Sequence, residues 1–303
     1  MKPQTKQILI GVGVGLAVVG TLLFILRKRL GGRTRLLSST KPLVCAHIGN
    51  LDHPNSTKAQ NSLKNVELNL ENNTDMIELD VQITKDNVPV LFHDNTLDDK
   101  TNGSGRIQDK TWDELSGVRY NSDSSQGITR LGDVIGALKK SRKPSILQLD
   151  KCDVNEIQKI KELGYFKGVE GQILCKGQSF DVPDQVRDAG VMWMPIIPTS
   201  YVGKMNNMNT IEEIVKKATG SDFLEAQFSD SDSLLIDGTL SKKLKNVGCR
   251  LLVVAVGGSQ STNGASFRGD NEKAWAKMIN PMKAGAIMTN YPLKLKSYIN
   301  QNT

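Results

Sequence analysis

Short apolar runs alternate with amphipathic stretches along most of this chain, from about residue 43 to residue 298. Short runs rich in β-branched residues predict buried strands, and apolar positions three or four residues apart predict helices. The predicted strands are Leu43–His47, Met76–Ile83, Ser145–Asp150, Gln172–Lys176, Val191–Ile197, Phe223–Phe228, Arg250–Val256 and Ala286–Thr289. The predicted helices between them are Ser62–Glu71, Leu131–Lys140, Val154–Leu163, Ile211–Thr219, Ser241–Asn246 and Asn271–Ile279. Eight strands alternating with helices predict a (β/α)₈ barrel of the TIM type.

The alternation is interrupted after the second predicted strand. A further short strand over residues 88–92 is followed by a region rich in Gly, Ser and Asp, residues 95–127. We interpret this region as a small insertion into the barrel.

The first part of the chain has a different pattern. Residues 8–26 are uncharged and strongly apolar, and at 1.5 Å per residue a helix of this length spans the ~30 Å core of a bilayer. The sequence therefore predicts a membrane anchor over residues 1–30, a linker over 31–41 and a barrel domain over 42–303. A cleaved signal peptide is the alternative, but Arg27, Lys28 and Arg29 stand where a small-residue cleavage site would lie.

The net positive charge of the chain is concentrated in its first 35 residues. Residues 1–35 hold seven of the 39 basic residues and no acidic one, which leaves 32 basic and 32 acidic residues in the rest. The formal charge of +7 belongs to the anchor region, so we expect no nucleic-acid partner; no protein partner is inferred. Five basic residues follow the apolar segment and two precede it, which favours a cytosolic barrel. Sequons at Asn55, Asn72 and Asn102 favour the opposite side.

Candidate chemistry begins in the second strand, where Glu78 and Asp80 stand two residues apart. Side chains alternate faces along a strand, so both carboxylates point the same way. A divalent cation is the commonest reason to bury two acids together. An all-oxygen site suits Mg²⁺ or Ca²⁺ better than Zn²⁺. The following hairpin brings His93 to the same region.

Polar residues also end most of the other predicted strands. In a barrel of this type the active site lies at the carboxyl ends of the strands. The residues at these ends are His47, Glu78, Asp80, Asp150, Lys176, Pro195, Glu225 and Asn290. Such a set is suited to binding a metal ion or a phosphate group.

Several of these residues fall in motifs that resemble the glycerophosphodiester phosphodiesterase family. The motifs, in chain order, are Ala46-His47-Ile48-Gly49, Ala59-Gln60-Asn61-Ser62, Ile77-Glu78-Leu79-Asp80-Val81, Val90-Leu91-Phe92-His93-Asp94-Asn95-Thr96-Leu97, Thr101-Asn102-Gly103-Ser104-Gly105 and Met288-Thr289-Asn290-Tyr291-Pro292. The resemblance implies a metal-dependent phosphodiesterase barrel. It implies that His47 and His93 are the acid and base, that Glu78 and Asp80 bind the metal, and that Asp150 is the third carboxylate.

The sequence also departs from the family pattern. Ile48 replaces an Arg that binds phosphate, Gln60 replaces a Glu, and Cys152 stands where a Lys is usual. Lys151 or Lys176 would then supply the missing positive charge. Sphingomyelinases D, which are related barrels, also lack the Arg and have an Asn at the position of Asn50.

Gln60, Asn50, Lys176 and Glu225 are therefore the expected substrate-binding residues. Three functions fit these observations. The first is hydrolysis of glycerophosphodiesters or lysophospholipids to a phosphomonoester and an alcohol, and a membrane anchor would keep such an enzyme close to lipid. The second is a lyase reaction of the sphingomyelinase D type that yields a cyclic phosphate. The third is a metal-binding member of the family without catalytic activity.

Overall fold

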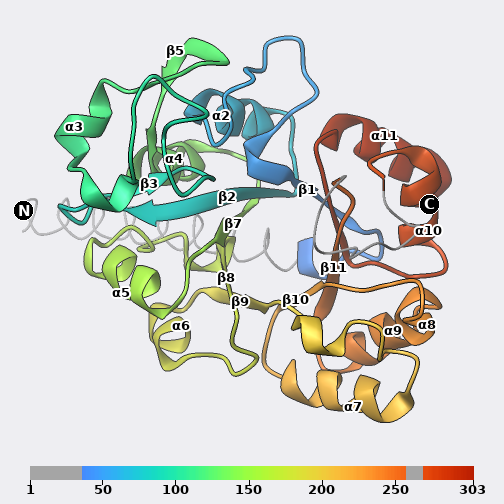
Figure 1. Ribbon diagram of the computed structural model, residues 1–303. Coiled ribbons are helices and arrows are strands. Elements are labelled where there is room, and N and C mark those ends of the chain that lie inside the picture. Colours follow the sequence, from blue (N-terminus) through green and yellow to red (C-terminus); the bar gives the residue numbers. More distant parts are fainter. Residues whose placement is uncertain (1–35, 257–268) are drawn as a thin grey trace, which may run out of the picture.

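The computed structural model describes residues 36–256 and 269–303. Its centre is a sheet in which eight strands run parallel in a nearly closed barrel (Figure 1). The eight strands are β1 (Leu43–Ala46), β2 (Met76–Ile83), β7 (Ile146–Asp150), β8 (Ile173–Gly177), β9 (Met192–Pro195), β10 (Phe223–Ala226), β11 (Arg250–Val254) and β12 (Ala286–Thr289). This confirms the predicted barrel.

The barrel closes between β9 and β10 through few hydrogen bonds. Ile196 and Glu225 form a single parallel bridge, and the Ile197 amide donates to the Glu225 carbonyl at 2.9 Å. Near the amino ends of the same two strands, the Asp222 amide donates to the Trp193 carbonyl at 3.0 Å. The remaining neighbours pair through regular parallel ladders.

Helices cover the outside of the barrel because their apolar stripes need burial against the sheet. They are α2 (Leu63–Glu71), α4 (Leu131–Lys140), α5 (Val154–Glu162), α6 (Asp184–Ala189), α7 (Met208–Lys217), α8 (Ser233–Ile236), α9 (Thr239–Asn246), α10 (Glu272–Ile279) and α11 (Pro292–Asn302). The sequence predictions missed α6, α8 and α11. α6 and α8 are six and four residues long, too short for a clear helical period.

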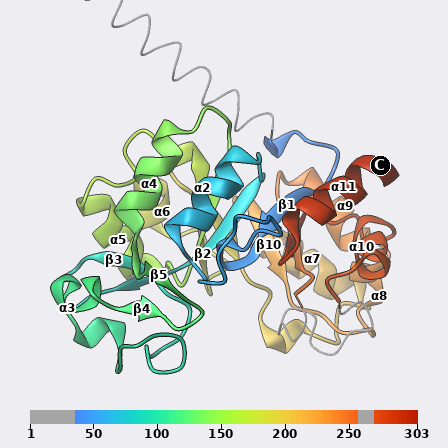
Figure 2. The same cartoon turned by 90° about the horizontal axis from the view of Figure 1, so that it is seen from above.

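The insertion follows β2 and has its own small core. Its elements are β3 (Pro89–Leu91), η2 (Ile107–Asp109), α3 (Trp112–Ser116), β4 (Arg119–Tyr120), β5 (Asp123–Gly127) and β6 (Thr129–Arg130). β3 runs antiparallel to the end of β2, and side chains including Phe92, Leu97 and Ile107 are buried together in the insertion core. Figure 2 shows these elements at the lower edge of the domain, away from the first described residues at the upper edge.

Side chains that point into the barrel change character along the strands. Near the amino ends they are apolar and form one cluster that includes Leu43, Met76, Ile146 and Phe223. Two residues further along the same strands lie Cys45, Glu78, Gln148 and Glu225. The interior of the barrel is thus an apolar core at the amino ends of the strands and a polar site toward their carboxyl ends.

No helix within residues 36–256 and 269–303 has the length and hydropathy of a membrane span. The predicted anchor at residues 8–26 lies outside the described residues, so it stays a prediction.

Candidate active site

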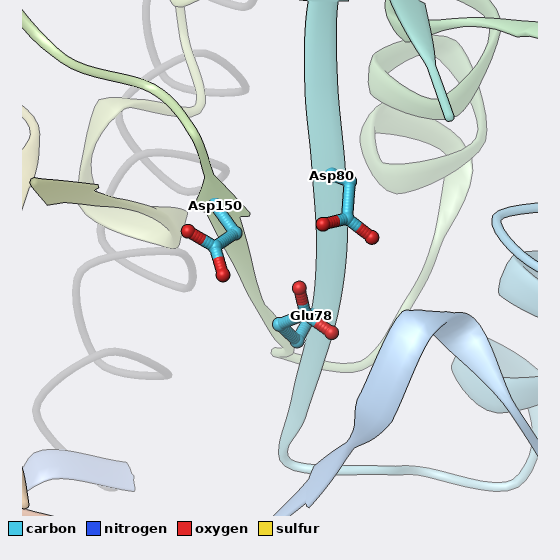
Figure 3. Close-up of side chains that lie close together, drawn as sticks. All are labelled: Glu78, Asp80 and Asp150. Atoms are coloured by element: carbon cyan, nitrogen blue, oxygen red, sulfur yellow. The ribbon is translucent and has the colours of Figure 1, made fainter. Parts of the chain in front are cut away.

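The centre of the site is a cluster of three carboxylates. Glu78 and Asp80 on β2 and Asp150 at the end of β7 each offer one carboxylate oxygen, and these three oxygens lie within 4.8 Å of one another. The β2–β7 register places Asp80 directly beside Asp150. Because Glu78 is two residues earlier on the same face, the three carboxylates surround one common space (Figure 3).

Burial makes this cluster electrostatically costly. Glu78 and Asp80 are each only 2% exposed. Burial raises the pKa of Glu78 well above its ordinary value, and the negative charges of Asp80 and Asp150 raise it further. The Ile48 amide, which donates to Glu78 Oε2 at 2.6 Å, offsets only part of this effect.

Two lysines reduce the negative charge. Lys176 on β8 donates from Nζ to Asp150 Oδ2 at 2.8 Å and lies 3.1 Å from Glu225 Oε2. Burial alone would raise the pKa of Asp150, but Lys176 and Lys151 outweigh burial and lower it. Likewise, burial opposes the charge on Lys176, yet the carboxylates of Glu225 and Asp150 raise its pKa.

Lys151 lies on the other side of the cluster. Its Nζ is 3.5 Å from Asp80 Oδ1 and also contacts the backbone carbonyl of His93. Four carboxylates, those of Glu78, Asp80, Asp150 and Glu225, face two ammonium groups here, which leaves a formal charge of −2. One divalent cation balances this charge, and oxygen ligands are those that Mg²⁺ and Ca²⁺ prefer. The residues therefore fit the predicted metal.

His47 lies at the end of β1, in the short helix η1 (His47–Gly49). Asn290 Oδ1 accepts a hydrogen bond from Asn50 Nδ2 at 2.9 Å, and it lies 3.0 Å from His47 Nδ1. An amide oxygen can only accept, so His47 donates its proton from Nδ1 to Asn290. In the neutral ring Nε2 then carries no proton and can accept one. Burial lowers the pKa of His47 below its ordinary value, although Asn290 and Asp80 oppose this shift.

His93 follows β3 and is more exposed than His47, with 49% of its side chain accessible. Its Nδ1 lies 2.6 Å from Asp94 Oδ1. The two histidines therefore have different environments: His47 is half-buried and contacts an amide oxygen, and His93 is exposed and contacts a carboxylate.

Two of the four predicted substrate-binding residues lie in loops near His47, and the other two lie inside the barrel. Asn50 lies beside His47 through Asn290, and Gln60 is half-buried in the loop before α2. Lys176 and Glu225 lie inside the barrel as an ion pair, and Glu225 is 2% exposed. Their position is better suited to holding Asp150 in place than to direct contact with a substrate.

Sequence analysis assigned no individual role to Asn61. It is not the cap of α2, because Ser62 caps that helix by accepting from the Asn65 amide. The fully buried Asn61 instead donates from Nδ2 to Asp80 Oδ2 at 3.1 Å and accepts from the Asp80 amide at 3.1 Å. Its backbone φ of +56° is one that Asn adopts more readily than most residues, which was the available signal.

Asp270 was also missed. It accepts from the Asn290 amide at 2.6 Å and from Trp275 Nε1 at 3.0 Å, and so holds the loop that carries Asn290. A single acidic residue in a polar loop gives no pattern from which this contact follows.

Comparison with known proteins agrees with this geometry. Residues 49–165 match the model of the glycerophosphoryl diester phosphodiesterase family. The matched segment resembles that family. It contains β2, the insertion and β7, and therefore all three carboxylates of the cluster.

Curated relatives that carry the name glycerophosphodiester phosphodiesterase match a short stretch of this chain. Glycerophosphodiester phosphodiesterase 1 of Rattus norvegicus is 43% identical over 56 residues, which are 18% of this chain and 17% of the relative. The matched part spans about a fifth of the length of these curated relatives.

Solved structures of diesterases share the fold over most of the chain. A glycerophosphoryl diester phosphodiesterase from Parabacteroides distasonis aligns with a TM-score of 0.63 at 19% identity, covering 89% of this chain and 92% of that one. A phosphodiesterase from Oleispira antarctica, solved with the product sn-glycerol-3-phosphate, gives a TM-score of 0.60 at 19% identity and covers 87% and 99%. At this identity the likeness shows the barrel fold.

Proposed function

We propose that this protein is a phosphoric diester hydrolase that acts on glycerophosphodiesters or lysophospholipids. The observation that carries the proposal is the cluster of three carboxylates at the same end of the barrel as His47 and His93; together with Glu225, Lys151 and Lys176 it has a formal charge of −2. The family match over residues 49–165 and the glycerol phosphate bound by the Oleispira enzyme support this substrate class.

Glu78, Asp80 and Asp150 would hold a Mg²⁺ or Ca²⁺ ion. When bound, such an ion supplies positive charge to the non-bridging oxygens of a phosphodiester. Lys176 and Asn61 hold two of the carboxylates in position, since Lys176 donates to Asp150 and Asn61 donates to Asp80.

The two histidines divide the proton transfers. His47 is the general base, because its lowered pKa and its Nδ1 contact with Asn290 leave Nε2 ready to accept a proton. It takes this proton from water or from a hydroxyl of the substrate. His93, whose ring contacts the Asp94 carboxylate through Nδ1, is the general acid that protonates the leaving alkoxide. Attack by water yields a phosphomonoester and an alcohol.

Attack by a hydroxyl of the substrate itself would instead give a cyclic phosphate, as in the sphingomyelinase D type of reaction. The Asn50–Asn290 contact beside His47 favours keeping this second candidate, because Asn50 is the residue shared with those enzymes. Analysis of the phosphorus products by NMR separates the two reactions.

Release of the alcohol from glycerophosphocholine and lysophosphatidylcholine tests the function directly. We expect turnover that EDTA abolishes and that Mg²⁺ or Ca²⁺ restores, and a loss of about 10²–10⁴-fold in kcat for His47→Ala. His53→Ala is the matched control, since His53 lies in a loop outside the carboxylate cluster and its ring accepts from the nearby Asn55 amide at 3.1 Å. No turnover of any phosphodiester, with a divalent ion bound, would support the non-catalytic alternative.

The apolar segment over residues 8–26 is proposed to anchor the protein in a membrane as a single span, with the barrel on the cytosolic side. Glycan addition at Asn55, Asn72 or Asn102 in cells, detected as a mass shift removed by a glycosidase, would place the barrel on the opposite side.

A further inference from the structure

The first described residues are held against the amino end of the barrel. Leu36 and Leu37 pack against the apolar cluster inside that end. Arg250, the first residue of β11, donates from Nη1 to the carbonyls of Leu36 and Leu37 at 3.2 and 2.9 Å, and from Nη2 to that of Lys41 at 3.3 Å. The chain therefore enters the barrel domain at a fixed place, at the end opposite to the carboxylate cluster.

The loops at this amino end have an uneven distribution of charge. Within the described residues, the loops that lead into the parallel strands carry five basic side chains, which we call the basic end: Lys41, Arg142, Lys143, Lys167 and Lys283. All but the half-buried Lys41 are exposed. Lysines in the last turns of the helices also lie here, but the helix dipole accounts for them.

The acidic residues of the same loops are turned toward the backbone. Asp75 Oδ2 accepts from the Val44 amide at 3.0 Å, and Glu170 Oε1 accepts from the Gly168 amide at 2.9 Å. Asp222 Oδ2 accepts from the Trp193 amide at 3.2 Å. These carboxylates are half-buried, so the side chains that reach solvent from these loops are mainly positive.

The chain upstream indicates what this surface faces. Nine residues, 27–35, separate the predicted membrane span from Leu36, and five of them are Arg or Lys. Nine extended residues reach roughly 30 Å at most, which keeps the basic end near the bilayer. An inverted barrel would require this short linker to pass the full height of the barrel and its helices. Anionic headgroups attract basic side chains held close to a membrane.

We propose that the basic end lies on an anionic lipid surface, so that the carboxylate cluster opens away from the bilayer. A substrate then arrives from water. On the proposed function, this favours soluble glycerophosphodiesters over lysophospholipids that reside in the same membrane. The anchor would fix the direction of the active site rather than bring it to the lipid.

Fluorescence quenching in nanodiscs tests this orientation with the full chain. Lys143→Cys places a label on the basic end, and Lys100→Cys is the matched control in the insertion, where Lys100 is exposed. The four native cysteines are buried, so labelling with a bimane thiol reagent is directed to the new site. The discs contain phosphatidylcholine with or without phosphatidylserine, and lipid with a spin-labelled headgroup serves as the quencher.

We expect the label at position 143 to lose fluorescence, more so with phosphatidylserine and less at high salt, and the label at position 100 to keep it. Arg142→Glu with Lys283→Glu should remove the effect of phosphatidylserine, whereas Lys100→Glu with Arg106→Glu should leave it. Unchanged thermal unfolding midpoints would show that these exposed substitutions preserve the fold.

Stronger quenching at position 100, equal quenching at both positions or none at either would overturn the orientation. A chain that does not associate with the discs would overturn the anchor as well. No turnover is measured, so failure of the proposed activity would not affect the result.

Discussion

Three residues with left-handed backbone conformation surround the carboxylate cluster. Ile48, Asn61 and Lys151 have φ values of +47°, +56° and +55°. Each contacts the cluster: the Ile48 amide donates to Glu78, Asn61 donates to Asp80, and the Lys151 amide donates to Asp150 Oδ1 at 2.7 Å. Such conformations cost of the order of 1–3 kcal/mol each and persist where the surroundings require them. Here they direct hydrogen-bond donors at buried negative charge.

Replacing Lys176 should strongly lower the stability of the metal-free protein. Lys176→Met would leave Asp150 and the buried Glu225 without their shared cation. Removing one partner of a buried ion pair costs about 3–5 kcal/mol, so the free energy of unfolding in urea should fall by this order. Lys217→Met is the control, because its pair with Glu213 is exposed and should change little. Adding Glu225→Gln to Lys176→Met should recover part of the loss; no recovery would contradict the pairing.

The pKa of His47 predicts a pH dependence of stability. Burial lowers this pKa below its ordinary value of 6.5, so the unfolded chain takes up the proton first as the pH falls. The contribution of His47 to the free energy of unfolding should therefore decrease from a pH of about 6.5 down to the lowered pKa, and change no further below it. Urea unfolding of the metal-free protein at several pH values measures this decrease. His47→Gln should show a weaker dependence, and an equal dependence would mean that the ring is not buried as a neutral group.

At the scale of elements, the strands place chemistry by their period of two. Along β2, Met76, Glu78 and Asp80 all point into the barrel, and the interior changes from apolar to polar in that order. The insertion positions His93 instead, since Phe92, which is buried in the insertion core, immediately precedes this histidine. The barrel strands thus hold the carboxylates, and the insertion positions the proposed acid.

This division predicts that damage to the insertion affects turnover more than metal binding. Ile107 is fully buried in the insertion core, and Ile107→Ala should cost about 2–5 kcal/mol of stability and lower kcat by loosening His93. The affinity for Mg²⁺ or Ca²⁺, measured by calorimetry, should stay unchanged. Ile160→Ala is the matched control, since Ile160 on α5 is equally buried but lies outside the insertion core. A similar loss of kcat in both variants would argue against a specific role of the insertion.

At the scale of the whole molecule, the barrel stores unfavourable charge that a bound cation would relieve. Three strands or strand ends, those of β2, β7 and β10, contribute the four carboxylates, so the cost is shared across the domain. A cation bound by the folded form alone stabilises that form by mass action.

We therefore expect Mg²⁺ or Ca²⁺ to raise the free energy of unfolding by about 2.7 kcal/mol at a concentration 100 times the Kd. Urea unfolding with and without the ion measures this difference. Glu78→Gln should remove the ion-dependent increase, because it takes away a central carboxylate. An undiminished increase in that variant would place the binding site elsewhere in the chain.

The periodicity of the sequence was enough to predict the barrel, the hairpin and the common face of Glu78 and Asp80. Strand periodicity is local, and a shared face follows from a spacing of two residues. The match of motifs added Asp150 and the two histidines. The sequence did not determine the roles of Asn61, Lys176 and Asp270, whose partners in the site, Asp80, Asp150 and Asn290, lie 19 or more residues away along the chain. Only the tertiary structure decided which charges meet, because contacts between strand ends depend on the register and closure of the barrel. It also decided that the chain enters at the end opposite to the carboxylates.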